Sequence, residues 1–526
     1  MGSPHTPLLE GELKRVLGNR VTLDFSGEKY IYYYREINDP IGLRGLSLRH
    51  GYNTYIKPLN FENCIFNNIV DIGDYDSAGT ISFKNCVFNS SLSIESKNTK
   101  LDGKCEFNKQ LKISVSESEE KFSNLLINDS LEINGSTNKL ELNNISSDKK
   151  RETQKIIIES NCVSLVIDNV ECNELKILSN DRLNRGLRLE NVIANKLSIG
   201  GIDLNSSINI NNCQIKEIEL WKIKGSSRHL NISNNCKIGL LNLPLQNFDK
   251  IDVSNVIVDQ ALLSNIHNEK SLLNIQNVTI TNFIFSKVYN YGLITLRELF
   301  IPEGGCISIK SSNLGKTDFI LCSFSNAYFE FENSKMTEVF LSETDFPKSI
   351  RLNEKMNPAQ AQLAFGQLHS AFLKQGDNIR ALEYQSREIE ALYNSLSFLK
   401  RSFPFVSFNK INLGFNKLSN NFGRDWGRGI VFSIGVGITF FYLLVISTQE
   451  YHFGFPITFD EKLFFAFLKF INPLRFFDTE NLFKVGDKDS FLHLSGASYL
   501  CDFLGRVFIA YGFYQTIQAF RRFGRK

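Results

Sequence analysis

Four polar side chains interrupt the last apolar stretch of the sequence, which reads YLCDFLGRVFIAYGFYQTIQAF over residues 499–520. They are Asp502, Arg506, Gln515 and Gln518. Asp502 and Arg506 are one helical turn apart and carry opposite charges, so they can neutralise each other on one helix face. Polar groups inside a membrane are costly unless they face a partner or water. Two interpretations are open: a self-paired ion couple near the outer boundary, or a set that lines a pore or bundle interior together with Gln515.

The cysteines and histidines form no recognisable catalytic or metal-binding pattern. Of ten cysteines, Cys64, Cys86, Cys213 and Cys236 directly follow an Asn in a recurring phrase, and Cys162 follows an Asn outside that register. The chain has only seven histidines, and it lacks CxxC pairs, zinc spacing, GxGxxG and P-loop patterns. We interpret the cysteines as reduced core residues of a cytoplasmic protein, with disulfides between neighbouring repeats as the alternative. We expect no enzyme activity, no catalytic residue, no cofactor and no metal.

The length and charge of the chain limit its partners. At 526 residues the chain is too long for one compact core, so several domains or a repeat array are expected. Its 59 basic and 56 acidic residues leave a formal net charge of +3. Duplex DNA usually requires a basic face, so this balance gives no strong nucleic-acid signal. The first residues contain no apolar signal region, so we expect most of the chain to lie in the cytoplasm.

A short phrase recurs along the first half of the chain: an apolar residue, any residue, Asn, and then Cys or Val. Its Asn lies at positions 63 and 85, and later at 169, 191, 212, 235, 255 and 277, in steps of 20 to 23 residues. Residues around the phrase alternate as in short strands, and Asn favours the corners between strands. This pattern predicts a mainly β fold, a stacked parallel β-helix over residues 51–352, after an N-terminal cap over residues 1–50. A two-sheet sandwich is the alternative.

The repeat tightens to multiples near five at the end of this region. The segments are SNLGKTDF at 312–319, CSFSNAYF at 322–329, SKMT at 334–337 and TDF at 344–346. From about residue 311 to residue 346 the sequence resembles the pentapeptide-repeat family. The resemblance implies a square, right-handed β-helix. Upstream, the longer steps depart from a five-residue register, so the cross-section there can differ.

Good helix formers replace the repeat from Asn357-Pro358 onwards. The interruption at Gly376-Asp377 predicts an αα-hairpin over residues 357–395, similar to a single tetratricopeptide unit. One face of its first helix is predicted to carry Leu363, Leu368, Ala371 and Phe372. We interpret the hairpin as a cap or coupling element, with partner docking as the alternative. Residues 396–428, rich in Phe, Asn and Lys, predict an interfacial linker.

Residues 429–448 contain no charge and are long enough to cross a hydrocarbon core. We predict a first span there and a second over about residues 499–520, so that residues 429–526 form a two-helix transmembrane domain. Between them, the apolar stretch 459–477 is interrupted by lysines and predicts an interfacial or re-entrant helix. Ser433 and Gly437 are one turn apart and predict a packing surface for another span.

Aromatic and basic residues flank both spans and are predicted to anchor them at the membrane interface. Trp426, Arg424 and Arg428 lie at the start of the first span, and Arg521 and Arg522 follow the second. By the positive-inside rule both ends of the chain are cytoplasmic and the loop over residues 449–498 is outside. The 44 Phe and three Met are typical of a low-GC bacterial composition. We therefore expect a multi-pass protein of a bacterial inner membrane, with the lipid bilayer as a partner.

The order of these parts resembles a group of bacterial membrane proteins. It combines the pentapeptide-like β-helix, a helical hairpin with GD at 376–377 and EIE at 388–390, and NFGRDW at 421–426 before two spans. This resemblance covers about residues 311–526, and some members carry a potassium-channel-like domain. The chain lacks the filter sequence TVGYG between its spans. The resemblance thus implies membrane anchoring and does not extend to a selective potassium pore.

Two functions from different classes fit this order. In the first, a sensor-effector, the cytoplasmic β-helix detects a protein or small-molecule trigger, and the membrane hairpin forms a homo-oligomeric pore or depolarises the bilayer, as in bacterial stress or antiphage defence. In the second, the chain is a membrane-tethered scaffold whose β-helix recruits a protein. Nucleic-acid mimicry is a third possibility, which the balanced charge disfavours. Asp502, Arg506 and Gln515 discriminate the first two: a shared oligomer axis favours the effector, and partners within their own chain favour the scaffold.

Overall fold

The computed structural model divides the chain into two units, residues 1–351 and residues 352–526. The structure describes residues 22–23, 30–33, 36–37, 41–42, 59–72, 81–95, 99–116, 119–147, 154–179, 182–183, 185–336, 338–345, 358–398, 407–451, 461–473, 479–484 and 492–524. Each unit has its own hydrophobic interior and is described separately.

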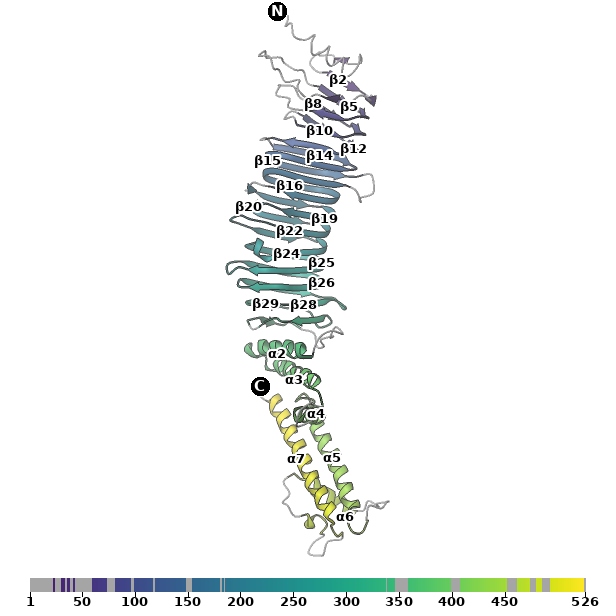
Figure 1. Cartoon of the computed structure of the whole chain (residues 1–526), viewed down its shortest axis with the longest axis vertical. Coiled ribbons are helices and arrows are strands. Elements are labelled where there is room, and N and C mark those ends of the chain that lie inside the picture. Colours follow the sequence, from purple (N-terminus) through teal and green to yellow (C-terminus); the bar gives the residue numbers. More distant parts are fainter. Residues whose placement is uncertain are drawn as a thin grey trace, which may run out of the picture. The chain divides into compact units, whose positions relative to one another are not determined.

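The first unit consists of strands that follow one another around a solenoid (Figure 1). Their bounds are β1 (Thr22–Leu23), β2 (Tyr30–Tyr33), β3 (Glu36–Ile37), β4 (Ile41–Gly42), β5 (Leu59–Glu62), β6 (Ile65–Phe66), β7 (Val70–Ile72), β8 (Ile81–Lys84), β9 (Val87–Phe88), β10 (Leu92–Ile94), β11 (Thr99–Asp102), β12 (Cys105–Phe107), β13 (Leu111–Val115), β14 (Glu119–Ile127), β15 (Ser130–Ser146) and β16 (Lys155–Leu178). The later strands are β17 (Arg182–Leu183), β18 (Gly186–Glu190), β19 (Ile193–Gly200), β20 (Asp203–Leu204), β21 (Ser207–Asn211), β22 (Gln214–Trp221), β23 (His229–Ser233), β24 (Lys237–Pro244), β25 (Lys250–His267), β26 (Leu272–Asn290), β27 (Leu293–Phe300), β28 (Cys306–Lys310), β29 (Thr317–Ile320), β30 (Tyr328–Glu332) and β31 (Phe340–Ser342), with a 3₁₀ turn η1 at Leu245–Asn247.

Parallel pairing between successive coils confirms the predicted β-solenoid, which has about 12 turns. The apolar residue of each phrase pairs with its equivalent one coil later, which builds a continuous buried column. That column is Ile167, Leu189, Ile210, Ile232, Val253, Ile275, Leu296, Phe319 and Leu341. At the other end of the unit, β3 and β4 already pair in parallel with β6 and β7, so parallel pairing includes residues within the predicted cap.

The Asn of each phrase makes the corner between two strands because its backbone adopts the left-handed conformation. The φ angles of Asn169, Asn191 and Asn212 lie between 50° and 53°. Asn enters this region at less cost than residues with larger side chains, and its amide can hydrogen-bond locally. The bend turns the next residue inward, which explains why Cys213 and Cys236 are fully buried. All ten cysteines are free in the structure, and eight of them are buried.

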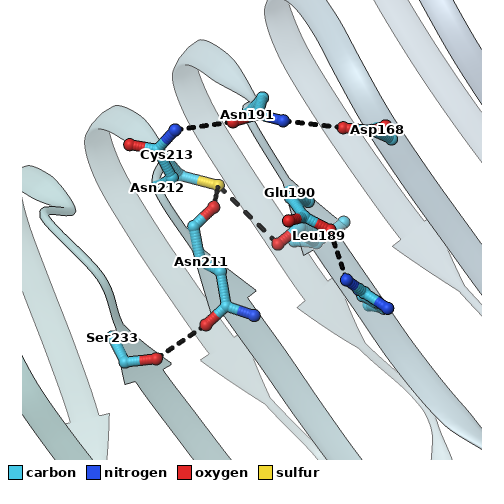
Figure 2. Close-up of polar contacts among 9 residues, drawn as sticks. Asp168, Leu189, Glu190, Asn191, Asn211, Asn212, Cys213 and Ser233 are labelled. Carbon is cyan, nitrogen blue, oxygen red and sulfur yellow. Dashed lines mark hydrogen bonds and ion pairs between the residues drawn. The ribbon is translucent and has the colours of Figure 1, made fainter.

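Side-chain ladders run along the outside of these corners, parallel to the solenoid axis (Figure 2). The Asn212 amide donates to Asn191 Oδ1 at 2.6 Å, and the Ser233 hydroxyl donates to Asn211 Oδ1 at 2.7 Å. Inside the corner, the Cys213 thiol donates to the Asn211 carbonyl oxygen at 3.1 Å. The phrase thus supplies one polar ladder to the surface and one small apolar column to the core.

The coil length does not change where the five-residue rhythm begins. Phe319 pairs with Leu296 of the preceding coil and with Leu341 of the following coil, which preserves steps of about 22 residues through residues 311–346. What changes is the corner residue, because Glu298, Leu321 and Glu343 take the left-handed position that Asn holds upstream. The structure is compatible with a pentapeptide-like β-helix, and its coils follow the longer period.

The second unit is helical (Figure 1). Its helices are α2 (Pro358–Lys374), α3 (Asn378–Ser395), α4 (Phe408–Asn420), α5 (Trp426–Ile446), α6 (Glu461–Ile471) and α7 (Gly496–Gly524), with a 3₁₀ turn η2 at Glu480–Leu482. The predicted first span corresponds to α5, and the predicted second span lies within α7. The predicted interfacial helix corresponds to the shorter α6, and residues 474–478 of that prediction lie outside the described residues.

Helices α2 and α3 form the predicted hairpin. Gly376 adopts a φ of 78° after α2, and Asp377 caps α3 by accepting a hydrogen bond from the Arg380 amide at 3.0 Å. The Phe372 and Tyr384 rings stack between the helices. The predicted α2 face was confirmed for Leu368, Ala371 and Phe372 and was wrong for Leu363, which is exposed because it lies beside the buried stripe. The stripe comprises Ala361, Ala364, Phe365, Leu368, Ala371 and Phe372.

Part of the predicted linker is a helix. Ser407 caps α4 by accepting a hydrogen bond from the Lys410 amide, and Asn421, with a φ of 50°, ends it. The sequence signal for this helix is an apolar stripe at helical spacing, formed by Phe408, Ile411, Phe415 and Leu418. Asp425 then caps α5 through the Arg428 amide, so the turn between α4 and α5 is only a few residues long.

Candidate functional site

The candidate site is the set of buried polar groups along α7, which have partners in separate segments of the second unit. Asp502 is 1% exposed, and its Oδ2 accepts hydrogen bonds from Thr479 Oγ1 and from Arg506 Nη2, both at 2.7 Å. The ion pair is therefore formed within α7, and Thr479, next to η2, adds a third group. Neutralisation inside one chain lowers the cost of burying both charges. This geometry is that of the self-paired couple.

Gln515 also has a partner in its own chain. Its Oε1 accepts a hydrogen bond from the Asn420 amide at 2.6 Å, and the Asn420 Oδ1 accepts one from the Gly423 backbone amide at 2.8 Å. Asn420 is the last residue of α4, so this chain of bonds joins α7 to the turn before α5. Gln518 is half-buried on the same helix. The structure does not bring Gln515 together with Asp502 and Arg506 in one cluster.

Ser433 and Gly437 lie on the inner face of α5, where small residues permit close packing. The Ser433 hydroxyl donates to the Gly429 carbonyl oxygen at 2.9 Å, and a Cβ on Gly512 of α7 would lie 2.2 Å from Ser433 Oγ. A Cβ on Gly429 would lie equally close to Thr516 Oγ1. These contacts place the predicted packing surface against α7 of the same chain. At the far end, Ser447 and Ser498 hydrogen-bond at 3.0 Å.

Arg424, one of the predicted interface anchors, has hydrogen-bond partners in the helical hairpin. Its guanidinium donates to the Ser386 hydroxyl and to Glu390 of α3, the latter at 3.4 Å. Burial, together with the nearby Arg387, lowers the pKa of Arg424 from its usual value, and Glu390 acts in the opposite direction. The Arg424 side chain thus bridges the hairpin to the turn before α5.

The remaining anchors lie at the surface of the described region. Trp426 is about half exposed and meets the Phe520 ring edge-on at 6.4 Å between centroids. Arg428 is exposed and forms an ion pair with Asp425 at 3.3 Å. Arg521 is exposed at the end of α7, and the side chain of Arg522 lies outside the described residues.

The turn at residues 421–423 is a feature that sequence reasoning missed. Asn421, Phe422 and Gly423 have φ angles of 50°, 59° and 84°, three consecutive left-handed residues. Phe422 is fully buried and contacts Tyr393 of α3. A bulky residue in this conformation is rare and persists only where the surroundings hold it. The available signal was the Asn-Phe-Gly sequence directly before a capping Asp.

The outer faces of α5 and α7 are apolar. Exposed side chains include Ile430, Val431, Ile434, Ile438, Phe503, Val507, Tyr514 and Ile517. Among the described residues, α5 is the one helix whose length and composition suffice to cross a membrane. Helix α7 is too polar in composition to count as a membrane span by the same criterion, although Asp502 and Gln515 are buried.

The solenoid thiols have the character of core groups. Burial raises the pKa of Cys162 to about 11 and that of Cys172 to about 12, so both are protonated at neutral pH. In the part of the chain that the structure describes, no three His, Cys, Asp or Glu side chains are grouped to hold a metal ion. No family model, no curated protein and no solved structure matches the chain.

Proposed function

We propose that the chain is a membrane-tethered scaffold, in which the solenoid recognises a partner or ligand and the C-terminal helices anchor it in a bilayer. One observation carries the proposal: the helices have polar groups inside and apolar groups outside. Asp502 and Gln515 are buried with partners, whereas Val431 and Phe503 are exposed. Such an arrangement is unfavourable in water and favourable in lipid.

Helix α7 serves as the second crossing in this proposal. A charged side chain at a bilayer centre costs about 2.5–3.5 kcal/mol on insertion scales. Asp502 and Arg506 therefore make the composition of α7 unfavourable for a membrane span. The pairing of Asp502 with Arg506, and of Gln515 with Asn420, reduces that cost within the chain. Exposed Phe, Val and Tyr side chains then face lipid.

The two helices are antiparallel, which supports a hairpin with both ends on one side. Trp426 at the start of α5 meets Phe520 near the end of α7, and Ser447 meets Ser498 at the opposite end. Arg428 and Arg521 therefore belong to the same end of the pair. By the positive-inside rule this end is cytoplasmic, in a bacterial inner membrane.

Helix α6 fits the interface between lipid and water. It buries Leu463, Ala466 and Phe470 against the other helices and exposes Phe464, Phe465 and Leu468. Lys462 and Lys469 flank these groups. An amphipathic helix with this distribution lies in the plane of a membrane surface.

The in-chain partners favour a scaffold over a pore. A pore built from Asp502, Arg506 and Gln515 would require these groups to face a shared axis, and each of them is bonded inside its own chain. Anchoring requires no further subunit.

The test is extraction of the full chain from membranes with alkaline carbonate. We expect the wild-type chain to stay in the pellet, and the double variant Val431→Arg, Ile438→Arg to leave it, because both side chains are exposed on α5. Ile257→Arg, at an exposed apolar position of the solenoid, is the matched control and should behave as wild type. A wild-type chain that carbonate releases, or that stays dispersed without detergent, contradicts the proposal.

A sensor-effector is the second candidate, and one observation favours it. Gly435 and Thr439 are exposed one turn apart on α5, and nothing lies within 4 Å of a Cβ placed on Gly435. Small residues on a lipid-facing surface let another helix approach closely, as an oligomer requires. A trigger at the solenoid would then open or depolarise the membrane, in a setting such as stress or antiphage defence.

A membrane-potential dye separates the two candidates in expressing cells. The effector predicts depolarisation that is lost on truncation after Tyr393 and weakened by Gly435→Leu, with Ile434→Leu as the control. An unchanged potential with every variant supports the scaffold.

A further inference from the structure

A groove lined by both polar and apolar side chains lies on the side of the solenoid, across the coils that contain β19, β22, β24 and β25. Its cavity volume is about 510 Å³, which is within the range of small-molecule sites. Four consecutive coils contribute outward side chains from equivalent positions. These are Gln214 and Lys216, then Lys237, then Ile257 and Asp259, with Ile193 and Asn195 from the coil before them.

The hollow exists because one position carries no side chain. Gly239 holds the place in its coil that Lys216 holds in the coil before, since the neighbours Ile215 and Ile238 pair in register. A Cβ on Gly239 would lie 2.5 Å from the Lys216 carbonyl oxygen, so the backbones are too close for any larger residue. The close approach of the coils therefore requires glycine and leaves the floor of the groove open.

Charge is unbalanced at this groove. Elsewhere on the solenoid, lysines form ion pairs between coils, as Lys196 does with Glu219 at 2.9 Å and Lys310 with Glu330 at 2.8 Å. Lys216 and Lys237 are exposed, and no carboxylate among the described residues pairs with either. Two ammonium groups on adjacent coils thus face a cavity that Asp259 also lines, and neither lysine forms an ion pair with that carboxylate among the described residues.

We propose that this groove binds a small organic anion. Lys216 and Lys237 hold its phosphate or carboxylate group, because an ammonium is a compact donor of three hydrogen bonds. The amides of Asn195 and Gln214 donate further hydrogen bonds, and the apolar part of the ligand lies on Ile193 and Ile257. Asp259, at the end of the groove, opposes a second negative charge there and favours a hydroxyl or amino group. This anion is then the ligand that the solenoid recognises, and in that respect the inference rests on the proposed function.

Pyridoxal 5′-phosphate is the probe for this site, applied to the full chain in lipid nanodiscs. It carries a phosphate, an apolar ring and an aldehyde that forms an imine with a nearby lysine, and borohydride then fixes the adduct for peptide mass spectrometry. We expect Lys216 or Lys237 to be labelled about tenfold more than Lys270 and Lys335. Those two lysines are also exposed, which makes them internal controls.

Competition identifies the chemistry of the anion. Inorganic pyrophosphate and citrate are added at constant ionic strength, with sodium chloride as the screening control. Suppression of labelling by either anion beyond that of sodium chloride supports the site, and the stronger competitor indicates phosphate or carboxylate. Uniform labelling of all four lysines, or equal suppression by sodium chloride, overturns it.

Two substitutions should act in opposite directions. Lys237→Gln should lower labelling of Lys216 by about tenfold, since it removes one charged contact. Asp259→Asn should raise labelling by about two- to fivefold, since it removes a repulsive charge. Lys335→Gln is the matched control and should change neither Lys216 nor Lys237. If both groove variants label as wild type, the proposal is wrong, and carbonate extraction tests the membrane anchor independently of this result.

Discussion

The solenoid and the C-terminal helices distribute polar groups in opposite ways. In the solenoid, Ile210 and Ile232 stack in the core while Asn191 and Asn212 form a hydrogen-bonded ladder outside. In the helices, Asp502 is buried and Val431 is exposed. The solenoid follows the rule for a protein in water, in which apolar burial stabilises the fold. The helices follow the rule for a medium that offers no hydrogen bonds.

The difference shows what holds each region together. A coil of the solenoid contributes apolar area and backbone hydrogen bonds to its neighbours, so its stability is distributed evenly. The helices depend on a few polar contacts between distant segments and on small residues that allow close packing. Mutations should therefore have concentrated effects in the helices and repeated, additive effects in the solenoid.

The largest expected effect comes from breaking the buried ion pair of α7. Asp502→Ala leaves the Arg506 charge buried without its counter-charge and should cost about 3–5 kcal/mol of unfolding free energy. The double variant Asp502→Leu, Arg506→Leu should recover most of that loss, since it removes both charges. Thermal unfolding in detergent, followed by the helical circular-dichroism signal, measures both. If the single and double variants lose the same unfolding free energy, the unpaired Arg506 charge is not the cause of the loss.

A core substitution in the solenoid should have the next largest effect. Ile232→Ala removes a fully buried side chain between Ile210 and Val253 and should cost about 2–5 kcal/mol. Ile257→Ala, at an exposed position, should stay within about 0.5 kcal/mol of wild type. Chemical denaturation followed by the β-sheet signal provides the comparison. Similar losses at both positions would contradict the assigned inner and outer faces.

His267 is a polar exception inside the solenoid and should make its stability sensitive to acid. The ring is 1% exposed, Nδ1 lies 2.7 Å from Asn290 Oδ1, and burial lowers the pKa of His267 from its usual value. Below the unfolded-state pKa near 6.5, the unfolded chain binds a proton at this histidine that the folded chain does not. The free energy of unfolding therefore decreases as the pH is lowered, by at most about 1.4 kcal/mol per pH unit. The loss ends below the lowered folded-state pKa.

Unfolding midpoints between pH 7 and pH 5 test this dependence. His267→Gln should flatten the slope over that range whatever its effect at pH 7. His229→Gln, at an exposed position, is the control and should keep the wild-type slope. An unchanged slope in His267→Gln would assign the acid sensitivity to other groups.

The smallest expected effect is a gain at the solenoid corner. Leu321 adopts a φ of 57° and is exposed at the position that Asn holds in upstream coils. Leu321→Asn should stabilise the chain by about 1 kcal/mol, because Asn enters the left-handed region at lower cost. Leu321→Ala keeps the Cβ and should give no comparable gain. A higher unfolding temperature for Leu321→Asn alone would show that Asn is the preferred residue at these corners.

The solenoid was predictable because its information is local and repeated. An Asn in each phrase bends the backbone where it stands, and alternation orients the flanking residues, so period and core column follow from spacing alone. Helix α5 was predictable for a similar reason, because an unbroken apolar run can be recognised without knowing which other segments pack against it. The face of α2 was missed only at Leu363, which precedes the buried Ala364 in sequence and lies just outside the buried stripe.

By itself, then, the sequence determined the coils, their Asn corners and inward cysteines, and the apolar helix α5. Only the tertiary structure decided which partners satisfy the buried polar groups: Thr479 for Asp502, Asn420 for Gln515, and Ser386 with Glu390 for Arg424. It also decided that the coils approach closely enough at Gly239 to leave a groove beside Lys216. The physical reason is distance along the chain. Backbone bends and amphipathic faces depend on neighbouring residues, whereas a buried hydrogen bond depends on which remote segment packs against it.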